Sequence, residues 1–134
     1  MLAVSQSRLA RSARLVCVVD DDAAVRDSMR ALLESRDLEV RDYASAQAFL
    51  DAGMDPDARC LLLDLHMPEM NGIELLETLR RRNIDTAAII ITGRSDNALK
   101  ARAQRAGVLE FLEKPVDEDE LFRSIDEAFR QNGG

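Results

Sequence analysis

The sequence predicts a single α/β domain in which helices cover both faces of a parallel sheet of five strands. Short apolar runs alternate five times with segments whose apolar residues recur at helical spacing. Three runs, 15–19, 60–63 and 87–91, are apolar at every position, which is typical of strands buried on both faces of a parallel sheet. A length of 134 residues with 46% hydrophobic residues fits one domain with its own core.

The five predicted strands lie at 15–19, 38–43, 60–64, 87–92 and 108–112. Segment 38–43 alternates between apolar and polar residues, which indicates an edge strand with one face in solvent. The strand at 60–64 ends in a carboxylate, Asp64, directly before a loop that contains Pro68 and the turn pair Asn71-Gly72.

Capping and turn residues bound the five predicted helices, whose expected starts are after Asp22, at Ser45, at Asn71 or Gly72, at Ser95 and at 117–120. The fourth helix, from about Ser95 to Ala106, has an apolar face composed mostly of alanine. Such a face buries little area, so we expect this helix to be weakly held and mobile. The last helix is expected to end at Asn132-Gly133.

The strand order follows from the connections. Right-handed crossovers restrict the possible topologies, and the common solution at this size is the flavodoxin-like (βα)5 doubly wound sheet of order 2-1-3-4-5. In that order the first and third strands are neighbours at the switch point, where ligands bind at the carboxyl ends of the strands. Asp20 and Asp21 follow the first strand and Asp64 ends the third, so we expect the three carboxylates to share one crevice.

The chemistry of this crevice indicates a metal and a phosphoryl group. Three close carboxylates repel one another, and a hard divalent ion such as Mg²⁺ relieves the repulsion. The sequence has no Cys/His cluster that would hold zinc. Thr92 and Lys114 lie on the same rim, at the ends of the fourth and fifth strands. A phosphoryl group on Asp64 would have its charge neutralised by the metal and Lys114, and would accept a hydrogen bond from Thr92.

Taken singly, each of these residues also has an ordinary structural role. Asp64 can cap a turn, and the acids at 20–22 can cap a helix. Thr92 can be a β-branched strand terminus and Lys114 a surface lysine. Their joint placement at four strand ends favours a functional site.

Four ordered motifs resemble those of the receiver domains of bacterial response regulators, and they are Val19-Asp20-Asp21-Asp22, Leu63–Gly72, Ile91-Thr92-Gly93 and Phe111-Leu112-Glu113-Lys114-Pro115. The resemblance extends from Leu15 to Arg130, and the last two motifs look most like receivers of the nitrogen-fixation regulator type. It implies a receiver domain at 15–131, between a flexible N-terminal tail at 1–14 and a C-terminal tail at 132–134.

The resemblance implies a role for each acid. Asp64 is expected to accept a phosphoryl group from a phosphohistidine on a sensor histidine kinase or phosphotransfer protein. Asp21 is expected to ligate Mg²⁺ directly, with Mn²⁺ as a possible substitute, and Asp20 to hold the ion through water. Asp64 and the backbone carbonyl of His66 complete the expected protein ligands. With Thr92 and Lys114, this set would catalyse its own phosphotransfer and dephosphorylation, unlike a metabolic enzyme.

The resemblance also implies a switch formed by Thr92 and Phe111, whose ring turns inward on phosphorylation after Thr92 moves. The alanine-faced helix between them would then move, and the face of the fourth strand, fourth helix and fifth strand would change its protein contacts. His66 departs from the residues expected at its position and is the only histidine in the chain. Its imidazole is expected to alter the lifetime of the phosphoryl group by steering or blocking water. A catalytic role for His66 is the less favoured alternative, because transfer to the acceptor needs no base.

Composition and charge indicate which partners and which cellular location to expect. A net charge of −7 disfavours direct nucleic-acid binding, and no apolar run is long enough to span a membrane. Cys17 and Cys60 each lie inside an apolar run, which indicates small buried residues in a reducing cytoplasm. The first 14 residues lack the apolar segment of a secretory signal, so we expect a cytoplasmic protein.

Three other classes of protein fit less well. A flavodoxin-like cofactor binder needs a phosphate loop of Gly, Ser and Thr after the first strand, where this chain has three acids. A phosphatase acting through an aspartyl-phosphate needs a second acid two residues after Asp64, where His66 stands. An unphosphorylated receiver-like interaction module stays open, although the complete set of acids, Thr92 and Lys114 argues against it.

We expect a stand-alone receiver that acts through contacts with a target protein that the sequence does not name. It is expected to be a monomer or a phosphorylation-linked dimer through the last two helices. The alternative is the receiver part of a longer DNA-binding transcription regulator.

Overall fold

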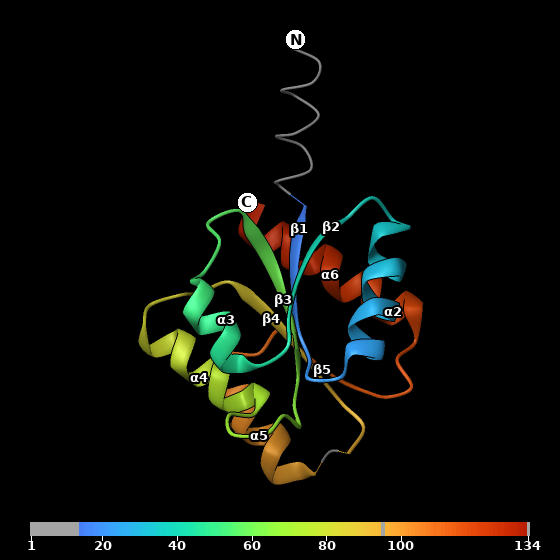
Figure 1. The fold of residues 1–134 in the computed structure, drawn as a ribbon. Coiled ribbons are helices and arrows are strands. Elements are labelled where there is room, and N and C mark those ends of the chain that lie inside the picture. The colour runs from blue at the N-terminus through green and yellow to red at the C-terminus, as the bar shows by residue number, and fades with distance from the viewer. Residues whose placement is uncertain (1–13, 95, 134) are drawn as a thin grey trace.

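The computed structural model describes residues 14–94 and 96–133, which form a five-stranded parallel sheet of order β2-β1-β3-β4-β5 (Figure 1). The strands are β1 Leu15–Val19, β2 Glu39–Tyr43, β3 Ala58–Asp64, β4 Ala87–Thr92 and β5 Glu110–Glu113. The helices are α2 Ala23–Glu34, α3 Ala46–Ala52, α4 Gly72–Arg81, α5 Asn97–Arg105 and α6 Glu118–Gly133. The predicted flavodoxin-like (βα)5 fold and strand order are confirmed. Apart from Arg14, the tail predicted at 1–14 lies outside the described residues.

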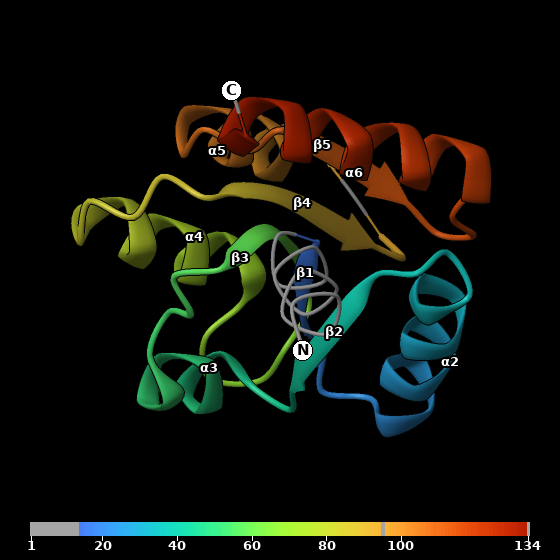
Figure 2. The same cartoon turned by 90° about the horizontal axis from the view of Figure 1, so that it is seen from above.

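Helices cover both faces of the sheet. Figure 2 shows α3, α4 and α5 on one side and α2 and α6 on the other. Successive residues of β3 alternate between the two cores, with Leu61 and Leu63 facing α3–α5 and Leu62 facing α2 and α6. Cys17 and Cys60 are free and fully buried, as their apolar surroundings predicted. Among residues 14–94 and 96–133, no helix has the length and apolarity needed to cross a membrane.

The predicted starts of two strands were wrong by two residues. β3 begins at Ala58, before the polar Arg59 that interrupts the apolar run in the sequence. β5 begins at Glu110 instead of Val108 because the end of α5 uses the intervening residues. Gly107 turns the chain with a φ of 81°, and the Val108 N–H still donates to the Ala103 carbonyl at 3.1 Å. The chain is therefore free to pair with β4 only after Val108.

Two helix boundaries also differ. The cap of α5 is Asp96, whose carboxylate accepts the Leu99 N–H at 2.7 Å, and the predicted cap Ser95 lies outside the described residues. Helix α6 continues through Asn132 and Gly133, where the sequence predicted its end. This second difference is within the one or two residues by which a terminal turn frays.

Candidate functional site

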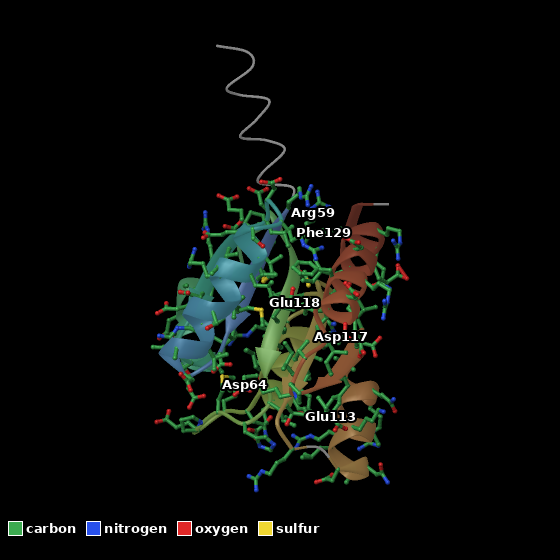
Figure 3. All side chains as sticks on the ribbon, turned by 90° about the vertical axis from the view of Figure 1, so that its right-hand side faces the viewer. Arg59, Asp64, Glu113, Asp117, Glu118 and Phe129 are labelled. Carbon is green, nitrogen blue, oxygen red and sulfur yellow. The ribbon has the colours of Figure 1, made fainter. Side chains whose placement is uncertain are left out.

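Three carboxylates meet at the carboxyl ends of β1 and β3, as predicted. Val19 pairs with Leu63, so the residues that follow these two strands are neighbours. One oxygen from each of Asp20, Asp21 and Asp64 lies within 4.8 Å of the others. Asp20 and Asp64 are buried and Asp21 is exposed, and Figure 3 shows Asp64 at the end of β3. The cluster therefore opens to solvent on the Asp21 side.

Burial and mutual repulsion perturb these acids. The pKa of Asp64 is raised from 3.8 to about 6, first by burial and then by the charge of Asp20, and Lys114 opposes both effects. Burial also raises the pKa of Asp20, while a hydrogen bond from the Asp22 N–H, 2.9 Å from Asp20 Oδ1, opposes the rise. A cation among the three oxygens would relieve both shifts. A set of three carboxylates fits a hard ion such as Mg²⁺.

Lys114 lies beside Asp64 and lines the same open pocket as the three acids. Its Nζ is 3.4 Å from Asp64 Oδ1, and its side chain is 38% exposed. This distance is longer than that of a tight charge-assisted hydrogen bond, so the ammonium has room to approach an added group. The Lys114 N–H donates to the Thr92 carbonyl at 2.8 Å, which ties the residue after β5 to the end of β4. The Lys114-Pro115 bond is cis.

Thr92 is fully buried, and its hydroxyl is occupied by the backbone of Arg94. The hydroxyl donates to the Arg94 carbonyl and accepts the Arg94 N–H at 3.0 Å. Phe111 lies in β5 opposite Ile90, half-buried against the core on the α3–α5 face. The structure thus places both predicted switch residues at adjacent strands, with Thr92 engaged by its own turn.

The loop after Asp64 brings His66 to the same rim. Its side chain is exposed, and Nε2 lies 2.9 Å from the Arg94 carbonyl. An open pocket of about 310 Å³ at this rim is lined by Asp20, Asp21, Asp22, Val25, Asp64, His66, Gly93, Arg94 and Lys114. All the predicted polar residues of the site except Thr92 therefore line one cavity. Phe111 is not among its lining residues.

Arg26 and Arg94 bear on the site and were missed from the sequence, whereas Gly72 was expected only as part of the loop after Asp64. A Cβ on Gly72 would lie 2.5 Å from the Asp64 carbonyl oxygen, so only glycine fits there without a shift of the backbone. Arg26 donates to the Asp20 carbonyl at 2.8 Å and supports the acid cluster from α2. The backbone carbonyl of Arg94 accepts a hydrogen bond from the Thr92 hydroxyl and lies 2.9 Å from His66 Nε2. A backbone carbonyl leaves no signal in the sequence, whereas the Asn71-Gly72 pair was a visible one.

Comparison with known proteins decides the family. A family model described as the response regulator receiver domain matches residues 16–126. The chain belongs to this family. As a receiver, it is 44% identical over 110 residues to the transcriptional regulatory protein FixJ of Azorhizobium caulinodans, covering 82% of this chain and 52% of that protein. It is 36% identical over 121 residues to the transcriptional regulatory protein TdiR of Thauera aromatica, covering 90% and 53%.

The solved structures agree with this assignment. The crystal structure of FixJ-N matches with a TM-score of 0.78 and 36% identity, covering 87% of this chain and 93% of that one. The predicted likeness to receivers of the nitrogen-fixation type is therefore confirmed. The chain spans about half the length of the curated relatives it matches.

Membership of the family establishes the general role. The chain is a response regulator receiver domain of two-component systems, a class of domain that pairs with histidine kinases. Phosphorylation is typical of the family, and so is the binding of Mg²⁺ at an acidic pocket. In this chain Asp20, Asp21 and Asp64 form a cluster of acids that could hold a metal ion.

Proposed function

We propose that the chain is a phosphorylation-switched receiver in which Asp64 accepts a phosphoryl group from a phosphohistidine of a sensor histidine kinase or phosphotransfer protein. The surroundings of Asp64 support this best. The carboxylate is buried, has Asp20 and Asp21 beside it and has the Lys114 ammonium 3.4 Å away. A transferring phosphoryl group carries negative charge that must be neutralised, and this arrangement offers positive charge from Lys114 and a place for a cation.

The proposed transfer exchanges one bond to phosphorus for another. A carboxylate oxygen of Asp64 attacks the phosphorus, the P–N bond of the phosphohistidine breaks, and the leaving imidazole takes up a proton. In dephosphorylation a water oxygen attacks the phosphorus, the P–O bond to Asp64 breaks, and inorganic phosphate leaves with the carboxylate restored. Lys114 pairs with the phosphoryl oxygens in both reactions.

The metal site would be built on the same acids. We assign Asp21 as a direct ligand of Mg²⁺ and Asp20 as one that acts through water. Asp64 and the backbone carbonyl of His66 would complete the protein ligands. When bound, Mg²⁺, or Mn²⁺ in its place, supplies neutralising charge and keeps Asp64 ionised at a pH near its raised pKa of about 6.

The switch would begin at Thr92. To donate a hydrogen bond to the phosphoryl group, its hydroxyl must leave the Arg94 carbonyl that it now contacts. The turn after β4 then rearranges, and Phe111 follows from its half-buried position on β5. The face of β4, α5 and β5 would change and alter protein contacts.

A second candidate function follows from the lengths of the relatives. FixJ of Azorhizobium caulinodans and TdiR are transcriptional regulatory proteins, and the chain spans about half of each. We therefore also consider the receiver part of a longer DNA-binding regulator. The net charge of −7 argues that any contact with DNA would lie outside this domain.

Intact-mass analysis tests the proposal. The protein incubated with acetyl phosphate and Mg²⁺ is expected to gain the mass of one phosphoryl group, and Asp64→Asn or added EDTA is expected to abolish the gain. Asp126→Asn, which changes an exposed acid on α6, is the matched control and should be labelled like the wild type. A wild-type protein that gains no mass with excess donor and Mg²⁺ would overturn the proposed function.

A further inference from the structure

Two hydrogen bonds from different segments meet on one backbone carbonyl, that of Arg94. The Thr92 hydroxyl donates to it from the end of β4, and Nε2 of His66 lies 2.9 Å from it. Because a carbonyl oxygen only accepts, the second contact requires the proton of the imidazole on Nε2. The two lone pairs of the oxygen accommodate both donors. One acceptor therefore connects the proposed switch residue to the histidine that follows Asp64.

The His66 imidazole connects the loop after β3 to the loop after β4. The Leu65 N–H donates to the Ile91 carbonyl at 2.9 Å, where the pairing of β3 with β4 ends. The hydrogen bond from His66 to Arg94 continues this connection beyond the strands, at the rim of the acidic pocket. Both residues are exposed, so the packing of a core does not account for their contact.

We propose that His66 is a positioning residue, whose imidazole holds the Arg94 carbonyl, and with it the Thr92 turn, in the arrangement of the unphosphorylated domain. We call this hydrogen bond the His66 latch. The inference rests on the proposed function of Asp64, because the turn has to move only if Thr92 must reach a phosphoryl group there.

The latch acts on a turn that must give up two hydrogen bonds. When the Thr92 hydroxyl leaves, its bond to the Arg94 carbonyl breaks, and so does the 3.0 Å bond from the Arg94 N–H. The latch opposes this rearrangement, because it fixes the carbonyl from a separate loop. His66 therefore slows the switch through its N–H donor and not through the bulk of its ring.

Three variants separate the donor from the bulk. His66→Leu removes the donor and keeps an apolar side chain of substantial size, whereas His66→Ala removes both. His66→Gln keeps an N–H donor at a similar reach from the backbone. Glu69→Gln is the matched control, since Glu69 is exposed in the same loop and belongs to neither the latch nor the acidic pocket.

Two measurements compare these variants with the wild type. The first is amide hydrogen exchange of Arg94 in the unphosphorylated protein, expected to be faster by roughly two- to tenfold in His66→Leu and His66→Ala, as for the loss of one neutral hydrogen bond. The second is the rate of phosphorylation by acetyl phosphate with Mg²⁺, expected to rise in the same two variants by a similar factor. His66→Gln and the Glu69→Gln control should match the wild type in both.

The outcomes also separate this inference from the proposed function. Exchange in His66→Leu that matches the wild type, with faster exchange only in His66→Ala, would show that bulk matters and would overturn the latch. A wild-type protein that accepts no phosphate would reject the role of Asp64. Exchange at Arg94 in the unphosphorylated protein would then still decide whether His66 holds the turn.

Discussion

The helices that follow β3 and β4, α4 and α5, are held in the fold in different ways. On the acceptor side, α4 buries Gly72, Ile73, Leu75, Leu76 and Leu79 and begins with a capping box between Asn71 and Glu74. On the switch side, α5 buries Ala103 alone among its residues and begins with the single cap of Asp96. The bidentate contact of Arg102 with Glu77, at 2.7 and 2.9 Å, connects α5 to α4 through side chains that are partly exposed. Helix α4 is therefore held by several buried side chains, whereas α5 buries one and has a partly exposed ion pair with α4.

This difference fits the two tasks of the proposed site. The acceptor oxygen must keep its distance from the metal ligands and from Lys114, because misplacement by about an ångström is costly in catalysis. The Thr92 turn and α5 must have a second arrangement, and elements that move are drawn from the weakly packed parts of a fold. The comparison predicts that substitutions on the two sides have unequal effects.

The largest expected difference in stability is between the alanine variants of two leucines, one on each helix. Leu76→Ala removes a fully buried side chain of α4 and is expected to lower the free energy of unfolding by about 3 kcal/mol. Leu99→Ala truncates a half-buried side chain of α5, and we expect a loss of about 1 kcal/mol. Urea denaturation of both variants measures the two values. Equal losses would contradict the view that α5 is weakly packed.

A smaller difference in stability is expected between the alanine variants of two glycines. Gly72→Ala places a Cβ 2.5 Å from the Asp64 carbonyl oxygen, so the backbone must shift, at a cost of about 2 kcal/mol and with slower labelling of Asp64. Gly93→Ala meets only Lys114 Cδ, at 4.0 Å, and its φ is not in the left-handed region. We expect its stability to stay within about 0.5 kcal/mol of the wild type. Thermal melts compare the pair, and a neutral Gly72→Ala would refute the close approach.

Some parts of the site could be predicted from the sequence, and others could not. Asp20, Asp64 and Thr92 were predictable because each stands where an apolar run stops, and Lys114 because it comes two residues after such a run. The strand order then brings those ends together. The role of the Arg94 carbonyl was not, since every residue has a carbonyl and only the folded loops bring His66 to it. The start of β5 was missed for a related reason, because the apolar Val108 gives its N–H to the helix before it.

The last prediction concerns the charge of Asp64, the proposed acceptor. The pKa of Asp64 is about 6 in the folded protein and near 3.8 when the chain is unfolded, so between these values the folded state holds a proton that the unfolded state has released. The stability of the metal-free protein therefore falls as the pH rises from about 4 to about 6, and the deficit stays constant above that range. At pH 7 the deficit is on the order of 2 to 3 kcal/mol, because solvent on the open side of the cluster reduces the full value of about 1.4 kcal/mol per pKa unit.

Asp64→Asn removes this titration and is expected to be more stable than the wild type by that amount at pH 7 in EDTA, with little difference at pH 4. A shallower fall remains, because burial also raises the pKa of Asp20. Denaturation across this pH range measures both curves, and Mg²⁺ should stabilise the wild type more than Asp64→Asn at pH 7. Parallel curves would show that folding does not raise the pKa of Asp64. A buried acid that destabilises the fold until a cation or phosphoryl group arrives is what separates a receptive acceptor from a structural aspartate.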